Sequence, residues 1–179
     1  MATFRQRAFE LAAGQHGYIT SADAAELEIP RIELVKLASR SGLRRVAYGI
    51  YRFDDLPSTR FDQFYEAVAR VGRDAHLTGD AVLALHELGQ VNPRRIRVGT
   101  PRRVERQLPD WIEMIKETVP AESLTVYELV PSTTVAYAIA ACVSTVMGSR
   151  SLVAVDRAEN NGLLNRHEAA ALRIRIETP

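Results

Sequence analysis

Basic residues are concentrated between Pro30 and Phe53 of this 179-residue chain, and they are its clearest candidates for binding a ligand. The segment reads PRIELVKLASRSGLRRVAYGIYRF and holds six arginine or lysine residues against one acid, Glu33. The whole chain has a net charge of only +1, so this charge is locally concentrated. Guanidinium and ammonium groups bind phosphate oxygens and the edges of guanine bases. A solvated helix and hairpin without a ligand is the alternative, but we favour binding to double-stranded DNA.

A helix followed by a hairpin is predicted to carry these basic residues. Leu34, Leu37 and Ala38 have the spacing of a helix with one buried side. After Gly42 the pattern becomes that of a β-hairpin that turns at Gly49. A helix in the major groove with a hairpin on the neighbouring phosphates is how a winged helix-turn-helix meets DNA. The candidate DNA-binding residues are Arg31, Ile32, Val35, Lys36, Ser39, Arg40, Arg44, Arg45 and Arg52.

Two apolar residues, Ile32 and Val35, fall on the outward side of the predicted helix. In a major groove they would contact thymine methyl groups, while Arg31 or Lys36 would read a guanine edge or hold a phosphate. Packing against another part of the same chain explains them equally well. The sequence leaves both interpretations open.

The residues before Pro30 predict the remainder of the module. Residues 3–13 have the apolar spacing of a helix, and residues 16–19 are too short for a helix and predict a brief strand. Thr20 is suited to cap a second helix over residues 21–27, where Asp23 meets the free amide groups of the first turn. Pro30 suits the first turn of the third helix.

The run HGYITSADAAELEIPRIELVKLASRSGLRRVAYGIYRF resembles the N-terminal winged-helix domain of AbiEi-type antitoxins from bacterial toxin–antitoxin operons. In that family a glycine–tyrosine strand, a short helix and a recognition helix precede a leucine, an arginine–valine pair and a glycine–hydrophobic–tyrosine–arginine wing. Leu43, Arg45–Val46 and Gly49–Arg52 stand in those places. Pro30 and Ser41 depart from the residues usual in the family.

A domain boundary is predicted at Asp54–Thr59, where acids, a proline and small polar residues break the periodicity. We expect a winged helix-turn-helix over residues 1–55 and a mixed α/β domain over residues 60–179, and therefore an α+β fold. Ala84–Gly89 and Pro131–Thr134 resemble the C-terminal region of AbiEi proteins more loosely. In the second domain we predict helices over residues 60–71, 78–88, 133–146, 150–160 and 166–176, and strands over 94–98, 111–115 and 124–130.

A second basic run lies in the middle of the predicted second domain. It is compatible with a charged sheet edge that resists aggregation, with an extension of the DNA surface, or with a docking patch for an acidic partner. The sequence does not separate these interpretations. The run consists of Arg94, Arg95, Arg97, Arg102, Arg103 and Arg106.

The residues of this sequence that could act in catalysis or bind a metal do not match a known catalytic or metal-binding motif. Asp74, His76, Asp80 and His86 are near one another in sequence, but their spacing matches no zinc signature. The sequence has neither a glycine-rich phosphate loop nor a nucleophile elbow. Cys142 lies in an apolar segment and is predicted to be a buried structural thiol. We expect no metal, no cofactor, no catalytic residue and no enzyme activity.

The resemblance implies an antitoxin that binds an inverted-repeat operator of its own operon and neutralises a nucleotidyltransferase-type toxin encoded by the adjacent gene. A homodimer on DNA would fit such an operator. Two alternatives remain: a winged-helix regulator with a ligand-sensing or oligomerisation domain, and an atypical phosphotransfer enzyme that acts on the toxin. No apolar run reaches about 18 residues and no signal-peptide pattern occurs. We therefore expect a cytoplasmic protein without a membrane partner.

Overall fold

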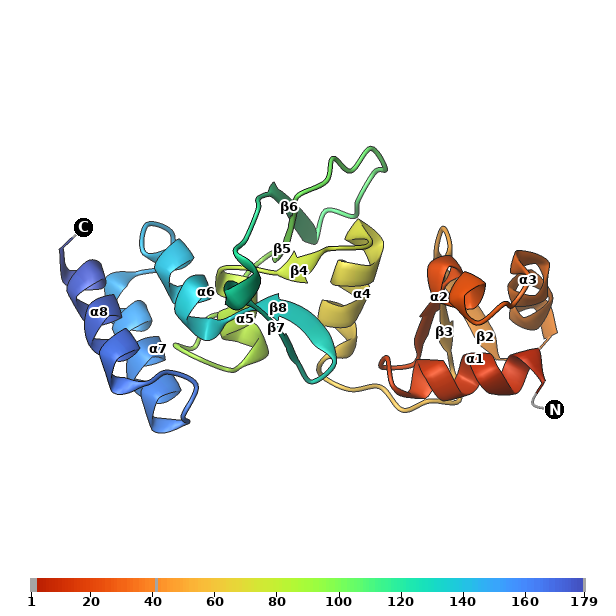
Figure 1. The fold of residues 1–179 in the computed structure, drawn as a ribbon, viewed down its shortest axis with the longest axis horizontal. Coiled ribbons are helices and arrows are strands. Elements are labelled where there is room, and N and C mark those ends of the chain that lie inside the picture. The colour runs from red at the N-terminus through yellow and green to blue at the C-terminus, as the bar shows by residue number, and fades with distance from the viewer. Residues whose placement is uncertain (1–2, 41, 179) are drawn as a thin grey trace. The chain divides into compact units, whose positions relative to one another are not determined.

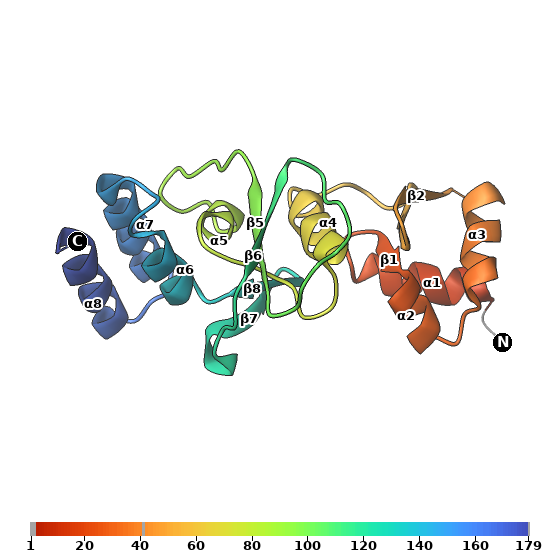
Figure 2. The same cartoon turned by 90° about the horizontal axis from the view of Figure 1, so that it is seen from above.

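The computed structural model describes residues 3–40 and 42–178 (Figures 1 and 2). The chain divides into two compact units, over residues 1–70 and 71–179. Within the described residues, the strands form one sheet of three strands and one of five. Helices occur beside both sheets, which confirms the predicted α+β class. Ser41, one of the two departures from the family's usual residues, lies outside the described residues.

The first unit has the helix and strand order of the predicted winged helix-turn-helix. Its strands pair antiparallel in the order β1-β3-β2, so β3 is the central strand. The last helix of this unit ends at the boundary between the units. The elements are α1 (Phe4–Ala13), β1 (Tyr18–Thr20), α2 (Ser21–Glu26), α3 (Arg31–Arg40), β2 (Leu43–Ala47), β3 (Ile50–Phe53) and α4 (Asp62–Val71).

The start of α2 shows how local chemistry fixes these elements. The Thr20 hydroxyl accepts a hydrogen bond from the Asp23 amide at 3.1 Å, and the Asp23 carboxylate accepts one from the Thr20 amide at 2.7 Å. This reciprocal capping box satisfies two backbone donors that a helix start leaves unpaired. The predicted cap is thereby confirmed, and α2 begins at Ser21.

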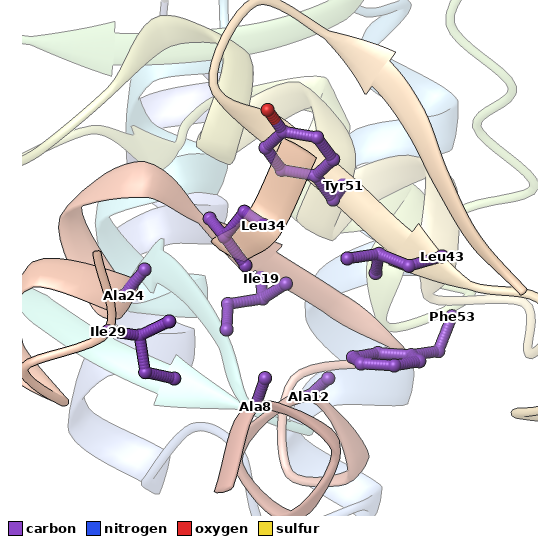
Figure 3. Close-up of a cluster of buried hydrophobic side chains, with 9 residues drawn as sticks. All are labelled: Ala8, Ala12, Ile19, Ala24, Ile29, Leu34, Leu43, Tyr51 and Phe53. Carbon is purple, nitrogen blue, oxygen red and sulfur yellow. The ribbon is translucent and has the colours of Figure 1, made fainter. Parts of the chain in front are cut away.

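A single apolar core holds the first unit together (Figure 3). The third helix contributes Leu34, which is fully buried, while Leu37 and Ala38 pack partly against the same core. The predicted inward side of this helix is therefore confirmed. The buried members of the core are Ala8, Ala12, Ile19, Ala24, Ile29, Leu34, Leu43, Tyr51 and Phe53.

Arg52 lies inside the first unit and not on its surface, which corrects its prediction as a phosphate-binding residue. Only 6% of Arg52 is exposed, because all four residues of the central strand β3 are buried. Its guanidinium forms a 2.9 Å ion pair with Asp62 of α4 and donates to the Leu56 carbonyl and the Ser58 hydroxyl. Together with the Thr59 hydrogen bonds, this guanidinium lowers the pKa of Asp62, against the opposing effect of burial. Arg52 thus ties the segment after the wing, and the start of α4, to the sheet.

The second unit is built on a mixed sheet in the order β6-β5-β4-β8-β7. Strands β5 and β6 run parallel, β4 pairs antiparallel with β5 and parallel with β8, and β7 and β8 form a hairpin. The elements are β4 (His76–Leu77), α5 (Asp80–Leu85), β5 (Ile96–Thr100), β6 (Ile112–Lys116), a 3-10 helix (Ala121–Ser123), β7 (Leu124–Tyr127), β8 (Val130–Thr133), α6 (Val135–Cys142), α7 (Gly148–Asn160) and α8 (Arg166–Glu177).

Two of the strands predicted for this unit differ from those in the structure. The strand predicted over residues 124–130 is a hairpin, because Glu128 and Leu129 both have positive φ and reverse the chain between β7 and β8. Such a turn usually carries asparagine or glycine, so the sequence did not indicate it. The strand predicted over residues 94–98 begins at Ile96, which leaves Arg94 and Arg95 before it.

The C-terminal part of the second unit consists of helices. Helix α5 packs against α6 and β5, and α6, α7 and α8 pack against one another. Asn165 and Glu168 form the predicted capping box at the start of α8. No helix in the described ranges is long and apolar enough to cross a membrane.

Replacement of Arg52 by alanine is expected to lower the free energy of unfolding of the first unit by about 3–5 kcal/mol, because it leaves the Asp62 carboxylate, whose side chain is only 14% exposed, without its cation. Arg44→Ala removes an exposed ion pair with Asp54 and should cost about 1 kcal/mol or less. Urea denaturation of the full chain, followed by far-ultraviolet circular dichroism, measures both changes. Equal small losses would contradict the structural role of Arg52.

Candidate nucleic-acid interface

All six residues of α3 that we predict from the sequence to contact DNA lie on the outward side of the helix. Leu34 anchors the helix in the core, and the helical period turns the remaining positions to solvent. The surface is mixed in chemistry, with cations, a hydroxyl and two branched apolar side chains. Its exposed residues are Arg31, Ile32, Val35, Lys36, Ser39 and Arg40.

The two apolar residues on this surface are exposed. Ile32 is 57% exposed and Val35 is 48% exposed. Within the first unit, packing against another part of the chain, which the sequence left open, therefore does not account for them. Exposed branched side chains on a helix flanked by arginine are suited to contact thymine methyl groups in a major groove.

Lys36 and Ser39 already have partners within α3. The Lys36 ammonium lies 2.7 Å from the Glu33 carboxylate, one helical turn away, and the Ser39 hydroxyl donates to the Lys36 carbonyl at 2.8 Å. An exposed ion pair of this kind contributes only about 0–1 kcal/mol. A phosphate or base edge can therefore replace Glu33 as the partner of Lys36 at little cost.

Tyr48 connects α3 to the wing and was not among the residues predicted from sequence. It stands at the hairpin turn before Gly49, whose φ of +71° favours glycine, and it is 68% exposed. The Arg31 guanidinium carbon lies 5.1 Å from the centre of the Tyr48 ring, and that of Arg45 lies 5.5 Å from it. The Tyr48 hydroxyl also raises the pKa of Arg31. An aromatic residue beside the turn glycine of an arginine-bearing hairpin is the signal that could have identified it.

The two adjacent wing arginines lie on opposite faces of the sheet. Directly paired residues share a face, and Arg45 pairs with the core residue Tyr51, so it belongs to the face that also packs α3. Arg44 pairs with Arg52 on the other face, and its guanidinium lies 3.1 Å from the Asp54 carboxylate. Arg45, and not Arg44, therefore shares the face of α3.

The second basic run does not form one continuous patch. Arg97 lies within β5, where it contacts Glu113 at 3.1 Å and Asp80 at 3.6 Å, so its charge is already compensated. Arg94 and Arg95 are exposed before β5, whereas Arg102, Arg103 and Arg106 follow the opposite end of that strand.

The four acidic and histidine residues that were considered as a metal cluster have separate partners. His76 is buried, with Nε2 3.2 Å from a Glu117 carboxylate oxygen, and the His86 ring lies 3.9 Å from the Tyr127 ring. Asp74 pairs with an arginine at 2.6 Å, and burial raises the pKa of Asp80. Within residues 3–40 and 42–178, no group of three or more such side chains is placed to hold a metal ion.

The predicted burial of the single cysteine is confirmed. Cys142 is fully buried in α6, and burial raises the pKa of its thiol to about 11. A thiol in this environment remains protonated and unreactive near neutral pH.

The helix and strand order of the first unit, with its exposed third helix and antiparallel wing, defines the class of winged helix-turn-helix DNA-binding modules. Residues 6–53 match the profile of the family described as "Transcriptional regulator, AbiEi antitoxin". The resemblance predicted from the sequence is therefore confirmed for this segment, which runs from α1 to the end of β3. The match supports a role as antitoxin and transcriptional regulator.

Other comparisons add little to this assignment. No curated protein matches the chain. Among solved structures, the chain is similar to the RV2827C protein from Mycobacterium tuberculosis, with 14% sequence identity and a TM-score of 0.43. The alignment covers 98% of this chain and 82% of that protein. At this identity and TM-score the similarity supports no transfer of properties.

Because Arg44 and Arg45 lie on opposite faces of the sheet, we expect their replacement to change the salt dependence of DNA binding differently. Arg45→Ala should reduce the slope of log affinity against log salt concentration by about 0.9, because one phosphate contact is lost. Arg44→Ala is the matched control and should leave the slope unchanged. Fluorescence anisotropy of a labelled duplex at several salt concentrations measures both slopes. A loss confined to Arg44→Ala would place the DNA on the other face of the sheet.

Proposed function

We propose that this chain is a cytoplasmic antitoxin and transcriptional autorepressor. It binds an inverted-repeat operator upstream of its own operon and neutralises a nucleotidyltransferase-type toxin encoded by the adjacent gene. One observation carries the proposal: the exposed side of α3 is joined through Tyr48 to Arg45, in a segment that matches the AbiEi antitoxin profile.

In the proposed complex α3 lies in the major groove of the operator. Arg31 donates to the N7 and O6 atoms of a guanine, and Ile32 and Val35 contact thymine methyl groups. Arg45 and the tip of the wing lie on the adjacent phosphates, which fixes the register of the helix but carries no sequence information. Stacking on Tyr48 restricts both guanidinium groups before DNA arrives, so less conformational entropy is lost on binding.

An inverted-repeat operator requires two copies of the recognition helix. We propose a homodimer on DNA, with half-sites about one helical turn apart or a multiple of it, roughly 34–36 Å. Linking two modules raises the apparent affinity because the second contact becomes intramolecular.

The two activities are proposed to reside in different parts of the chain. The winged helix over residues 1–55 binds DNA, and the domain over residues 60–179 neutralises the toxin. For separate expression the chain is best divided after Arg70, because the buried Arg52–Asp62 ion pair holds the start of α4 to the wing. Arg94 and Arg95, both exposed, are candidates for the contact with an acidic partner.

Arg31→Ala is expected to weaken operator binding by about 1–3 kcal/mol and to relax the preference at one base pair, because it removes a base-edge contact. Arg175→Ala, an exposed arginine on α8, is the control and should bind as the unaltered chain does. Gel shifts with the operator and a set of single-base variants measure both effects. Unchanged affinity and unchanged sequence preference for Arg31→Ala would remove α3 from the interface.

The two proposed activities should separate when the units are expressed alone beside the toxin. Residues 71–179 should restore colony growth at least partly without repressing a reporter driven by the operon's promoter. Residues 1–70 should bind the promoter, more weakly than the full chain, and should not restore growth. Rescue by residues 1–70 alone would place the antitoxin activity in the winged helix and overturn the proposed division.

A further inference from the structure

A cavity of about 340 Å³ lies in the second unit, where the end of α4 leads into β4 and β5 leads into the loop before β6. Residues from two separate stretches of sequence line it, 71–73 and 100–106 without Pro101. The volume is within the range of small-molecule sites, about 300–1,000 Å³. The lining includes Gly72, Arg73, Thr100, Arg102, Arg103 and Arg106.

Contacts to the backbone fix the walls of this cavity. The Arg106 guanidinium donates to the Val71 carbonyl at 3.4 Å, which ties the loop to the end of α4. Gly72 has a φ of +119°, and a Cβ atom there would lie 3.0 Å from the same guanidinium, so glycine permits this close approach. The Arg102 amide donates to the hydroxyl of the buried Thr100 at 3.2 Å. The side chain of Arg106 and the backbone at Arg102 are therefore held in place at the cavity.

The lining of the cavity holds more basic than acidic side chains. Four arginines and one acid, Glu105, line it, and Arg102 pairs with Asp74 at 2.6 Å. Guanidinium groups that line one cavity repel one another, and an anion bound among them reduces this repulsion. A bound anion would relieve this repulsion and gain several charge-assisted hydrogen bonds at once.

We propose that this cavity binds the phosphate groups of a small phosphorylated ligand. The planar guanidinium matches two oxygens of a phosphate, and arginine is the side chain best suited to such bidentate contacts. The hollow shape suits the end of a small ligand better than a duplex, whose backbone is continuous. Because the lining contains no aromatic side chain, recognition is directed at the phosphates and not at a stacked base. The site shares no residue with the proposed DNA contacts of α3.

Isothermal titration calorimetry of the full chain with sodium pyrophosphate, in a magnesium-free buffer of constant ionic strength, tests the proposal. The unaltered chain should bind one pyrophosphate, and Arg103→Ala should bind at least tenfold more weakly. In the described residues Arg103 makes no ion pair or hydrogen bond whose loss would affect the fold. Arg175→Ala, which removes an exposed arginine of α8 outside the cavity, is the matched control and should bind as the unaltered chain does.

A second variant and two further ligands extend this experiment. They distinguish a loss of binding from a loss of folding and indicate the class of ligand. Arg103→Lys keeps the charge but loses the bidentate geometry, so it should bind pyrophosphate with intermediate affinity. ATP in place of pyrophosphate should bind through the same residues if the natural ligand is a nucleotide, and inorganic phosphate should bind more weakly than either. Absence of pyrophosphate binding, or equal losses in Arg103→Ala and Arg175→Ala, would overturn the proposal. So would a result in which Arg103→Ala weakens only binding to a non-operator duplex. Because neither operator nor toxin is present in the pyrophosphate arm, its outcome does not depend on the proposed antitoxin role.

Discussion

The burial of Leu34 is the contact on which the DNA-binding surface depends. It is the one fully buried side chain of α3 among the described residues, and it packs in the same core as Ile19 and Tyr51 (Figure 3). Because the helix is fixed along this side, the period of 3.6 residues turns Arg31, Val35 and their neighbours outward together. The same core holds Tyr51 of the wing, which places Arg45 on the face that packs α3. One apolar cluster thus sets the position of both parts of the candidate interface.

Much of the first unit could be predicted from sequence because the deciding interactions are local. Helical spacing identified the buried and exposed sides of α3, and the Thr20–Asp23 pattern identified the start of α2. The error at Arg52 has a different origin. Alternation in a hairpin does not reveal which strand will be central, and β3 lies between β1 and β2. The partner of Arg52 is Asp62, beyond the predicted domain boundary, so its burial is a tertiary property.

The second unit was less predictable because its features combine distant segments or use atypical turns. The β7–β8 hairpin turns at Glu128 and Leu129, where no glycine or asparagine indicates a reversal. The arginine run looks continuous in sequence, but β5 separates its two ends and Arg97 is compensated by Asp80 and Glu113. The cavity joins residues 71–73 to residues 100–106 and has no sequence signature. Tyr48 was missed for a similar reason, since its two arginine neighbours come from different elements.

The central claim is that α3 and the tip of the wing together form the surface that binds DNA. Hydrogen–deuterium exchange of the full chain, with and without a duplex from the region upstream of its gene, measures this most directly. The account predicts slower exchange in residues 31–40 and 45–50 with this duplex, and a smaller effect with an unrelated duplex of equal length. It predicts no change in the buried strand β3 beyond Ile50 or in α4. Unchanged exchange in residues 31–40, with protection elsewhere in the chain, would contradict the claim.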